Sequence, residues 1–449
     1  MLQVIAKTGN ICVDMENSKI QKYGIDKIAF LGLLVMSLIV ASFVVRFKTS
    51  LMLSAPIELM HTGLSVSIPV GRGWQSTDGW LYNRTYFSMT SSFAPQPKGL
   101  NPQVDIKYLL AREKETPARW LEEMQTVVKG QVKQKGQIKR DSITIEWMCL
   151  VKPQSVFGVH FVGAAALPNG RFLILQVTDG TGDTEFAREI FERTANSVTF
   201  VDNKLLAAGE QIAAEIKNAG LDTLLGDAAA SNYFVIKDKK SHPVGFSMDT
   251  VLVQPYVKTI KGTGYYYNKG RYVDEESSIF ECDPNLGNFS SKEESLGFGS
   301  VEGAELKIEA DGFVTVTSFG RNIEKESYYA GAAAIPEAFA DLVLKKMAMS
   351  DCNQLVVDLV RTNGGVLPTY VEKVAGDDAN GKKFTVKYLI DAASVQDVFL
   401  DENLKIEKVV DHSSQRVYYR STQEEIINNF PERGEFILQK SEIIKQQQI

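Results

Sequence analysis

The stretch VFGVHFVGAAALPNGRFLILQVT, from Val156 to Thr178, decides the fold of the first globular region of this chain. Two apolar runs, 156–167 and 171–178, flank the tripeptide Pro168-Asn169-Gly170. An Asn-Gly pair tolerates positive φ at both positions of a tight turn, so the pattern predicts a β-hairpin. A sheet is therefore expected at the centre of this region.

On either side of this hairpin, the sequence alternates between strands and two well-marked helices. Thr116 is the expected N-cap of the first helix, and Pro117 takes its first position, where a missing N–H costs nothing. Asp183 or Thr184 is expected to cap the second helix. The order of strands, helix, strands and helix predicts an antiparallel sheet with helices packed on it.

The two ends of this region carry a family resemblance. It opens with Pro69-Val-Gly-Arg-Gly-Trp74 and closes with a helix and strand that run from Ile190 to Phe200. With this order of elements, residues 63–202 resemble the PsbP-like fold family. The resemblance implies an accessory or assembly protein without catalysis, and no functional residue of the plant members of that family can be placed on this chain.

The remainder of the chain reads as a helical connector, 203–230, followed by a mostly antiparallel β domain, 231–440. One helix, from Pro336 to about Met349, interrupts its strands. The strand-turn-strand units and the turn at Asp401-Glu-Asn403 are similar to the curved half-barrel of the LolA-like lipoprotein-carrier group. That similarity implies a curved sheet able to hold an apolar ligand.

An uninterrupted apolar run from Ile28 to Val45 predicts a single transmembrane helix, because about 18 residues reach roughly 27 Å. Its mixed-charge leader, 1–27, argues against a cleaved signal peptide. More lysines precede the run than basic residues follow it, which places the leader in the cytoplasm and the bulk outside the cell membrane, periplasmic or extracellular. The expected anchor residues are Ile28, Phe30, Leu33, Leu38, Phe43 and Val45.

The predicted fold class is therefore α+β. A single-pass signal-anchor helix comes first, then an antiparallel sheet with packed helices, then a mostly antiparallel β domain with one inserted helix. A net charge of -6 argues against nucleic-acid binding, which needs a basic face. The four histidines are far apart, and no HExxH, CxxC or GxSxG motif is present. We therefore expect no cofactor, no metal and no enzymatic activity.

Two clusters are candidate binding residues. The densest basic stretch would be solvated or would contact anionic lipid headgroups, and it comprises Lys129, Lys133, Lys135, Lys139 and Arg140. Four tyrosines, Tyr265, Tyr266, Tyr267 and Tyr272, would line a ligand cleft or pack as ordinary cross-strand contacts. Cys282 and Cys352 would form a disulfide or stay as two free thiols.

These observations predict a membrane-anchored, extracytoplasmic and non-enzymatic protein that acts in binding, assembly or scaffolding. The alternative is a carrier that binds a lipid or other apolar ligand in its C-terminal β domain. An enclosed apolar cavity of several hundred Å³ would favour the carrier. A filled core with an exposed apolar patch would favour a protein partner.

Overall fold

The computed structural model describes residues 30–40, 51–71, 73–77, 79–93, 102–112, 115–152, 158–180, 183–225, 229–254, 259–269, 275–297, 300–320, 323–362, 364–374 and 382–446. The chain divides into two units, Met1–Met52 and Leu53–Ile449. The domain limits expected from the sequence within the second unit stay a prediction.

In the first unit, residues 30–40 form a helix on which Phe30, Leu33 and Leu38 are exposed. No helix in the described part of the chain combines the length and apolarity needed to cross a membrane. The prediction of a single-pass transmembrane helix is therefore contradicted. Ile28, Phe43 and Val45 lie outside the described residues.

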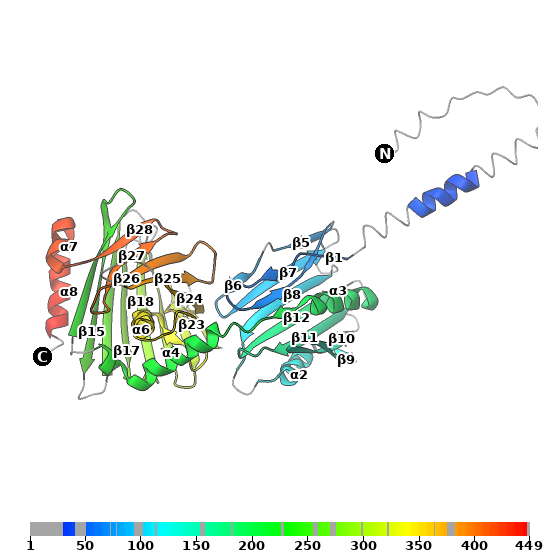
Figure 1. The fold of residues 1–449 in the computed structure, drawn as a ribbon, viewed down its shortest axis with the longest axis horizontal. Helices are drawn as coiled ribbons and strands as arrows, with labels where there is room; N and C mark the ends of the chain where they lie inside the picture. Colours follow the sequence, from blue (N-terminus) through cyan, green and yellow to red (C-terminus); the bar gives the residue numbers. More distant parts are fainter. Residues whose placement is uncertain are drawn as a thin grey trace, which may run out of the picture. The chain divides into compact units, whose positions relative to one another are not determined.

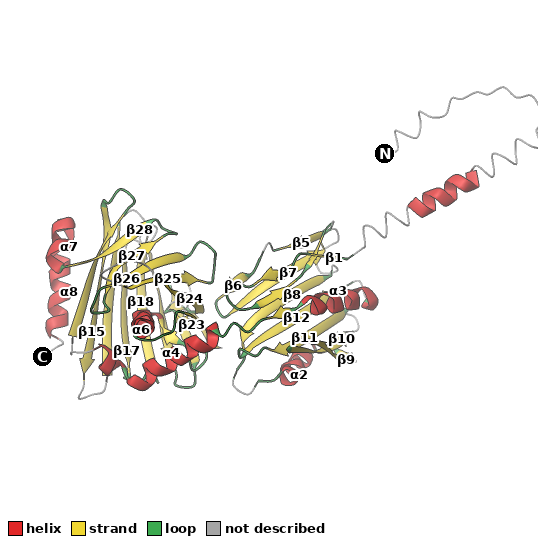
Figure 2. Ribbon diagram, viewed as in Figure 1, coloured by secondary structure: helices red, strands yellow, loops and turns green. Residues whose placement is uncertain are grey.

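The predicted α+β class is also wrong, because the structure is mostly β (Figure 2). The helices are short, and most of residues 229–308 form six consecutive strands. Two of these strands carry serine and glutamate on both faces, as in Glu275–Cys282 and Phe289–Gly297, so their alternation is weak. The helical share was overestimated because such strands lack the usual apolar signal.

An eight-stranded antiparallel sheet with the order β5-β7-β8-β12-β11-β10-β9 forms the first part of the second unit, and β6 pairs with β7. Its strands are β5 (Trp74–Ser76), β6 (Leu81–Asn83), β7 (Tyr86–Phe93), β8 (Gln103–Leu110), β9 (Gln131–Arg140), β10 (Ile143–Val151), β11 (Val159–Ala166) and β12 (Arg171–Asp179). Short strands lie beside it: β1 (Met52–Leu53), β2 (Ile57–Glu58), β3 (Leu64–Val66), β4 (Pro69–Val70) and β13 (Thr199–Phe200).

Two helices cover opposite faces of this sheet. Helix α2 (Pro117–Val128) packs over Met148 and Leu150, whereas α3 (Thr184–Ser197) places Phe191 against Trp147. Neighbouring residues of a strand point to opposite faces, so Trp147 packs under α3 and Met148 packs under α2.

Both predicted helix starts are confirmed. Thr116 Oγ1 accepts a hydrogen bond from Arg119 N at 3.2 Å, and Pro117 is the first helical residue of α2. Asp183 Oδ1 accepts one from Phe186 N at 3.0 Å at the start of α3. Each cap satisfies an N–H group that the first helical turn leaves without a partner.

The predicted hairpin is present as β11 and β12, in register from Val159↔Asp179 to Ala166↔Phe172. Its turn differs in one respect, because only Gly170 has a positive φ, of 75°. Leu167 and Arg171 close the loop with a hydrogen bond from Leu167 N to Arg171 O at 2.8 Å. The longer loop therefore needs one left-handed residue where a two-residue turn would need two.

The rest of the second unit is built on one fifteen-stranded sheet, counted over the described residues, with the order β21-β20-β19-β18-β17-β16-β15-β14-β28-β27-β26-β25-β24-β23-β22. Every neighbouring pair is antiparallel except β22 and β23, which are parallel. The strands are β14 (Ala229–Lys237), β15 (Pro243–Gln254), β16 (Thr259–Asn268), β17 (Glu275–Cys282), β18 (Phe289–Gly297), β19 (Ser300–Ile308), β20 (Phe313–Phe319), β21 (Glu324–Tyr329), β22 (Ile335–Pro336), β23 (Gln354–Val360), β24 (Val366–Val374), β25 (Lys382–Tyr388), β26 (Val395–Leu400), β27 (Ile406–Asp411) and β28 (Arg416–Ser421).

This sheet curves around a helix, which is seen end-on among the strands in Figure 1. The predicted helix at 336–349 is present as a short 3-10 turn, η2 (Glu337–Phe339), followed by α6 (Ala340–Ala348). Phe339 and Met347 are fully buried in a core that draws on both halves of the sheet. The inserted helix therefore fills one end of the curved sheet.

The helices that precede and follow this sheet in the sequence pack on opposite faces of it: the connector joins the core around α6 through Ile216, and the C-terminal helices cover the other face. The expected connector forms α4 (Leu205–Ala219) and α5 (Leu221–Leu225). Helix α4 packs so closely on β23 that a Cβ at Gly209 would lie 1.9 Å from Val356 O. Two C-terminal helices that the sequence analysis missed, α7 (Gln423–Asn429) and α8 (Gly434–Gln446), cover β14 to β16 through Phe430 and Ile437.

Candidate functional site

A cavity of about 520 Å³ occupies the end of the curved sheet that α6 leaves open. Its charged lining residues are all acidic: Asp249, Glu276, Glu293 and Glu337. Tyrosines, serines, Gln396 and a few apolar side chains make up most of the remaining wall. A volume of this size is typical of sites for small molecules.

The strand register explains why the sheet is hollow at this level. Asp249 pairs with Gly264, Gly264 with Ser278, and Ser278 with Glu293 across β15 to β18. Residues paired across antiparallel strands point to the same face, so these four form one row on the inner wall. Two small residues in the middle of the row leave space between two carboxyl groups.

The rows of paired residues on either side of this row differ in polarity. On one side, Ser247, Tyr266 and Glu276 continue the polar wall. On the other side, the ring of Phe280 lies over Gly262 and makes an edge contact with Phe339 at a centroid distance of 5.1 Å. The interior therefore changes within two residues of each strand from a filled apolar core to a polar cavity.

Tyrosine hydroxyls near the cavity are held by a polar network. Asn268 Nδ2 donates to Tyr266 Oη at 2.7 Å, and Arg416 donates to Asn268 Oδ1. Burial, followed by the neighbouring Tyr266, raises the pKa of Tyr418 above its ordinary value. The Tyr418 hydroxyl is therefore neutral at neutral pH, and Asn268 holds the Tyr266 hydroxyl in place.

Three cavity carboxyls have pKa values above their ordinary range. Burial, with a smaller contribution from Asp341, raises the pKa of Asp249 to about 6. Burial raises the pKa of Glu276, and burial followed by the charge of Glu276 raises that of Glu293. Each shift expresses the cost of an ionised carboxylate with little water around it.

One cation lies among these carboxyls. Arg361 Nε contacts Glu337 Oε2 at 3.2 Å. Burial alone would lower the pKa of Arg361, but Glu337 and Glu293 outweigh burial and raise it. The guanidinium therefore stays charged, and it compensates one of the four carboxyl groups.

The carboxyls are not placed as a metal centre. Within the described residues, no group of three histidine, cysteine, aspartate or glutamate side chains could hold a metal ion. The arrangement offers hydrogen-bond acceptors and negative charge to a ligand that fits the hollow.

The predicted tyrosine cleft is split between two faces of β16. Tyr266 lines the cavity, but the side chains of Tyr265 and Tyr267 pack on the outer face with Phe246 and the C-terminal helices. Tyr272 lies outside the described residues. The four acidic lining residues were missed, because only the three-dimensional register brings them together.

The predicted basic stretch lies along the edge of the first sheet. Lys133, Lys135 and Lys139 are exposed and alternate along the edge strand β9, Arg140 ends that strand, and Lys129 caps α2 with a φ of 54°. Lysines on an edge strand commonly oppose pairing with another sheet. Contact with lipid headgroups stays a prediction.

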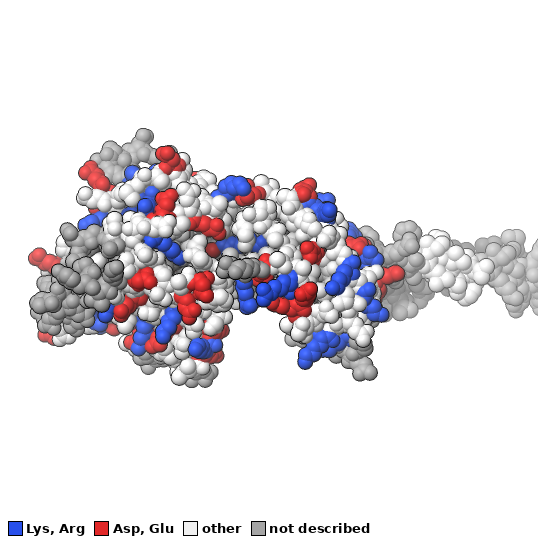
Figure 3. All heavy atoms as spheres, turned by 90° about the horizontal axis from the view of Figure 1, so that it is seen from below, with Lys and Arg blue, Asp and Glu red and all other residues white. Residues whose placement is uncertain are grey.

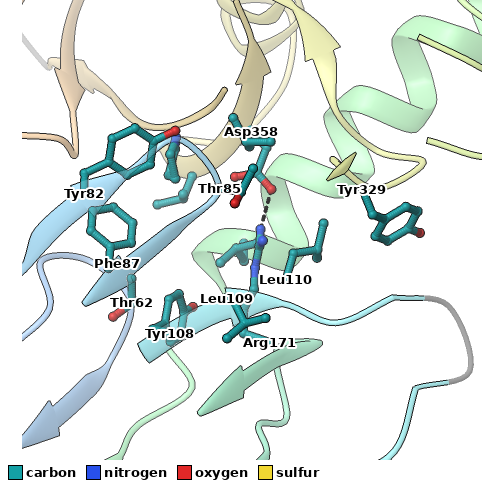
Figure 4. A pocket seen from close by; sticks show the side chains of 14 residues that line it. Thr62, Tyr82, Thr85, Phe87, Tyr108, Leu109, Leu110, Arg171, Tyr329 and Asp358 are labelled. Atoms are coloured by element: carbon teal, nitrogen blue, oxygen red, sulfur yellow. Dashed lines mark hydrogen bonds and ion pairs between the residues drawn. The ribbon is translucent and has the colours of Figure 1, made fainter. Parts of the chain in front are cut away.

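A second hollow lies where the two sheets meet, and Figure 4 shows the side chains around it. Its volume is only about 20 Å³, room for about one water molecule. Arg171 of β12 points from one sheet to Asp358 of β23 in the other, and the two form an ion pair. Their side chains are only 7% and 11% exposed.

The surroundings of the junction shift the pKa values of Arg171 and Tyr108. Burial would lower the pKa of Arg171, but Asp358 outweighs it and raises the pKa. Burial raises the pKa of Tyr108, which lines the same hollow, to about 12. His61 stacks on Tyr370 of β24 with ring centroids 3.8 Å apart. This site joins two sheets and is too small for a ligand.

Charged side chains of both signs are mixed on one face of the molecule. On the face shown in Figure 3, lysine and arginine are interspersed with aspartate and glutamate. The cysteines in the described residues, Cys149, Cys282 and Cys352, are free, so the disulfide left open by the sequence is not formed. The internal cavity is therefore the main candidate site of the described chain.

Neither a known protein family nor a curated protein matches this sequence. Among solved structures, a β-barrel-like protein of the DUF1849 family from Brucella abortus is similar at 11% identity and a TM-score of 0.31, covering 43% of this chain and 94% of that one. The cyanobacterial PsbP protein CyanoP from Synechocystis is similar at 13% identity and a TM-score of 0.24, covering 34% and 94%. At such low scores, a PsbP-like relationship is only weakly suggested.

Proposed function

We propose that this protein is a non-enzymatic binding protein that holds a small polar molecule inside its curved fifteen-stranded sheet. One observation carries the proposal: the row of Asp249, Gly264, Ser278 and Glu293 opens a cavity of about 520 Å³ beside the filled apolar core of the sheet. Protein interiors are normally close-packed, so a hollow of this size with fixed polar groups is a feature that ligand binding explains.

The lining supports a polar ligand rather than a lipid. The apolar end of the sheet is filled by α6 and by the aromatic rings of Phe280, Phe289 and Phe339. An acyl chain in the remaining cavity would lie against Glu276, Glu293 and Tyr266, whose polar groups would lose water without gaining partners. The carrier function therefore has less support for apolar ligands than for polar ones.

A scaffolding role has less support from the surface. Large exposed apolar residues of the second unit come singly from separate strands, helices and loops, including Leu81, Val127, Val201, Phe313, Ile323 and Met349. Scattered residues of this kind are ordinary for protein surfaces. An accessory role for residues 63–202 as a PsbP-like domain, a LolA-like origin of residues 231–440 and an extracytoplasmic location stay predictions.

Ligand-observed NMR on the purified full-length chain tests this proposal, with a collection of small polar molecules of positive, neutral and negative charge. We expect some members to bind. The variant Ser278→Leu places an apolar side chain in the cavity and should abolish their binding. Ser327→Leu, at an exposed position of β21, is the matched control and should leave binding unchanged.

Thermal unfolding of both variants shows that each is folded before binding is measured. The proposal fails if no member of the collection binds the native chain. It also fails if the molecules that bind do so equally well to Ser278→Leu, because their site is then elsewhere.

A further inference from the structure

We infer that the ligand of this cavity is an organic cation, held through an ammonium or amidinium group by the carboxylate of Asp249. The inference rests on the proposed function and specifies the chemical class of the ligand.

The charge balance of the cavity favours a cation. Asp249, Glu276, Glu293 and Glu337 face the hollow, and no lysine, arginine or histidine is among its lining residues in the described chain. Arg361 lies nearby and pairs with Glu337, so it compensates one carboxylate of four. An anionic ligand would meet repulsion from the remaining three, whereas a cation would relieve it.

Asp249 itself lacks a partner of opposite charge among the described residues. It has no hydrogen-bond or ion-pair partner among the residues that the structure describes, although the protein around it raises the pKa of its carboxyl. Its side chain is nevertheless accessible, because its accessible surface opens into the cavity. A carboxylate that is largely surrounded by protein and has no partner is costly, and natural proteins usually provide one. Here no described residue is that partner, and the space for one is present.

The wall beside this carboxylate is shaped to leave it open to the cavity. A Cβ at Gly264 would lie 3.0 Å from Asp249 Oδ1 and 2.5 Å from Ser278 Oγ. Glycine at this position therefore keeps the carboxylate open to the cavity, and the Ser278 hydroxyl is a second acceptor beside it. An ammonium group has several N–H donors and can use both oxygens.

The other charges around Asp249 agree with this assignment. Glu276 and Glu293 belong to β17 and β18, Glu337 and Asp341 come from η2 and α6, and Lys345 pairs with Asp341 at 2.9 Å. The surrounding field is thus negative except for groups already paired. A cation would enter a hollow whose Tyr266 and Tyr418 rings offer further favourable contact.

Three probes with the same four-carbon span separate the charge classes: 1,4-diaminobutane, 1,4-butanediol and succinate. Isothermal titration calorimetry with the full-length chain at neutral pH measures each. We expect 1,4-diaminobutane to bind at least about tenfold more tightly than the diol or succinate. Asp249→Asn should weaken its binding by about tenfold or more, and Glu293→Gln should weaken it less.

Glu305→Gln, which removes an exposed carboxylate from β19 of the same sheet, is the matched control and should bind like the native chain. Equal or tighter binding of the diol or succinate overturns the cation assignment but leaves a polar binding protein. Unchanged binding of the diamine to Asp249→Asn overturns the role of Asp249. If 1,4-diaminobutane fails to bind while other polar molecules bind a cavity that Ser278→Leu blocks, this inference fails and the proposed function stands.

Discussion

Charged side chains form an ion pair at the junction between the two sheets, whereas a carboxylate in the cavity of the curved sheet has no partner among the described residues. At the junction, Arg171 and Asp358 meet in a hollow of about 20 Å³. In the cavity, Asp249 lies in a hollow of about 520 Å³ without a partner among the described residues. The charge at the junction is compensated by another residue of the fold. The carboxylate beside open space is not, and a bound ligand would compensate it.

The largest expected effect comes from breaking the pair at the junction. Asp358→Ala leaves the Arg171 guanidinium buried and unpaired, which should cost about 4 kcal/mol of unfolding free energy. Urea denaturation followed by circular dichroism measures it. Glu326→Ala breaks the exposed pair with Arg84, half-exposed on both sides, and should cost less than about 1 kcal/mol.

Removing both charges provides the complementary test. The double variant Arg171→Met with Asp358→Leu should recover most of the lost stability, because no uncompensated charge remains. Equal effects of Asp358→Ala and Glu326→Ala would show that the junction pair is not held in a buried site.

The second effect separates the filled end of the curved sheet from the hollow end. Phe339→Ala removes a ring that is 1% exposed and should cost about 3 kcal/mol. Phe234→Ala removes a half-buried ring that lines the cavity and should cost about half as much, because one side already lacks neighbours. The midpoints of urea denaturation compare the stability of the two variants. Equal losses of unfolding free energy would contradict a hollow beside Phe234.

The third effect concerns the unpaired carboxylate. Burial raises the pKa of Asp249 from 3.8 to about 6, so the folded state binds this proton more tightly than the unfolded state. Its contribution to stability is therefore complete below about pH 4 and is lost as the pH rises through about 6. Asp249→Asn should stabilise the ligand-free chain by about 1.5 kcal/mol at pH 8, with allowance for screening by water in the cavity.

At pH 4 the same variant should differ little from the native chain. Glu305→Gln, exposed on the outer face, should change the unfolding free energy by less than about 0.5 kcal/mol at either pH. A destabilised Asp249→Asn at pH 8 would mean that the carboxylate already has a partner in the folded chain.

Local signals in the sequence predicted the parts of the fold that local chemistry determines. Thr116-Pro117 and Asp183 marked helix starts, and Pro168-Asn169-Gly170 marked the hairpin. Helix α7 was missed although its start has the same type of signal, since Thr422 Oγ1 accepts a hydrogen bond from Glu425 N at 3.2 Å.

Neither site could be predicted in the same way. Arg171 and Asp358 are 187 residues apart, and the row from Asp249 to Glu293 exists only once four strands are in register. The polar cavity also made the strands harder to predict. Strands β17 and β18 place serine and glutamate on the inner face, so the alternation of apolar and polar residues that marks a strand on an apolar core is missing. A strand run rich in glutamate and serine within a β domain is the signal that could have pointed to a polar interior.

The smallest expected effect on stability concerns the solvated lysines at the edge of the first sheet. Lys133, Lys135 and Lys139 are exposed on the edge strand β9 and have no ion-pair partner among the described residues. Changing all three to serine should alter the unfolding free energy by less than about 0.5 kcal/mol, because solvated charges contribute little to folding. The edge would lose its protection, so sedimentation velocity should show more self-association of the triple variant. The matched variant Lys239→Ser with Lys240→Ser, in an exposed turn, should stay as the native chain does. A large loss of stability in the triple variant, with no change in association, would instead mean that these lysines are structural, as the junction pair is.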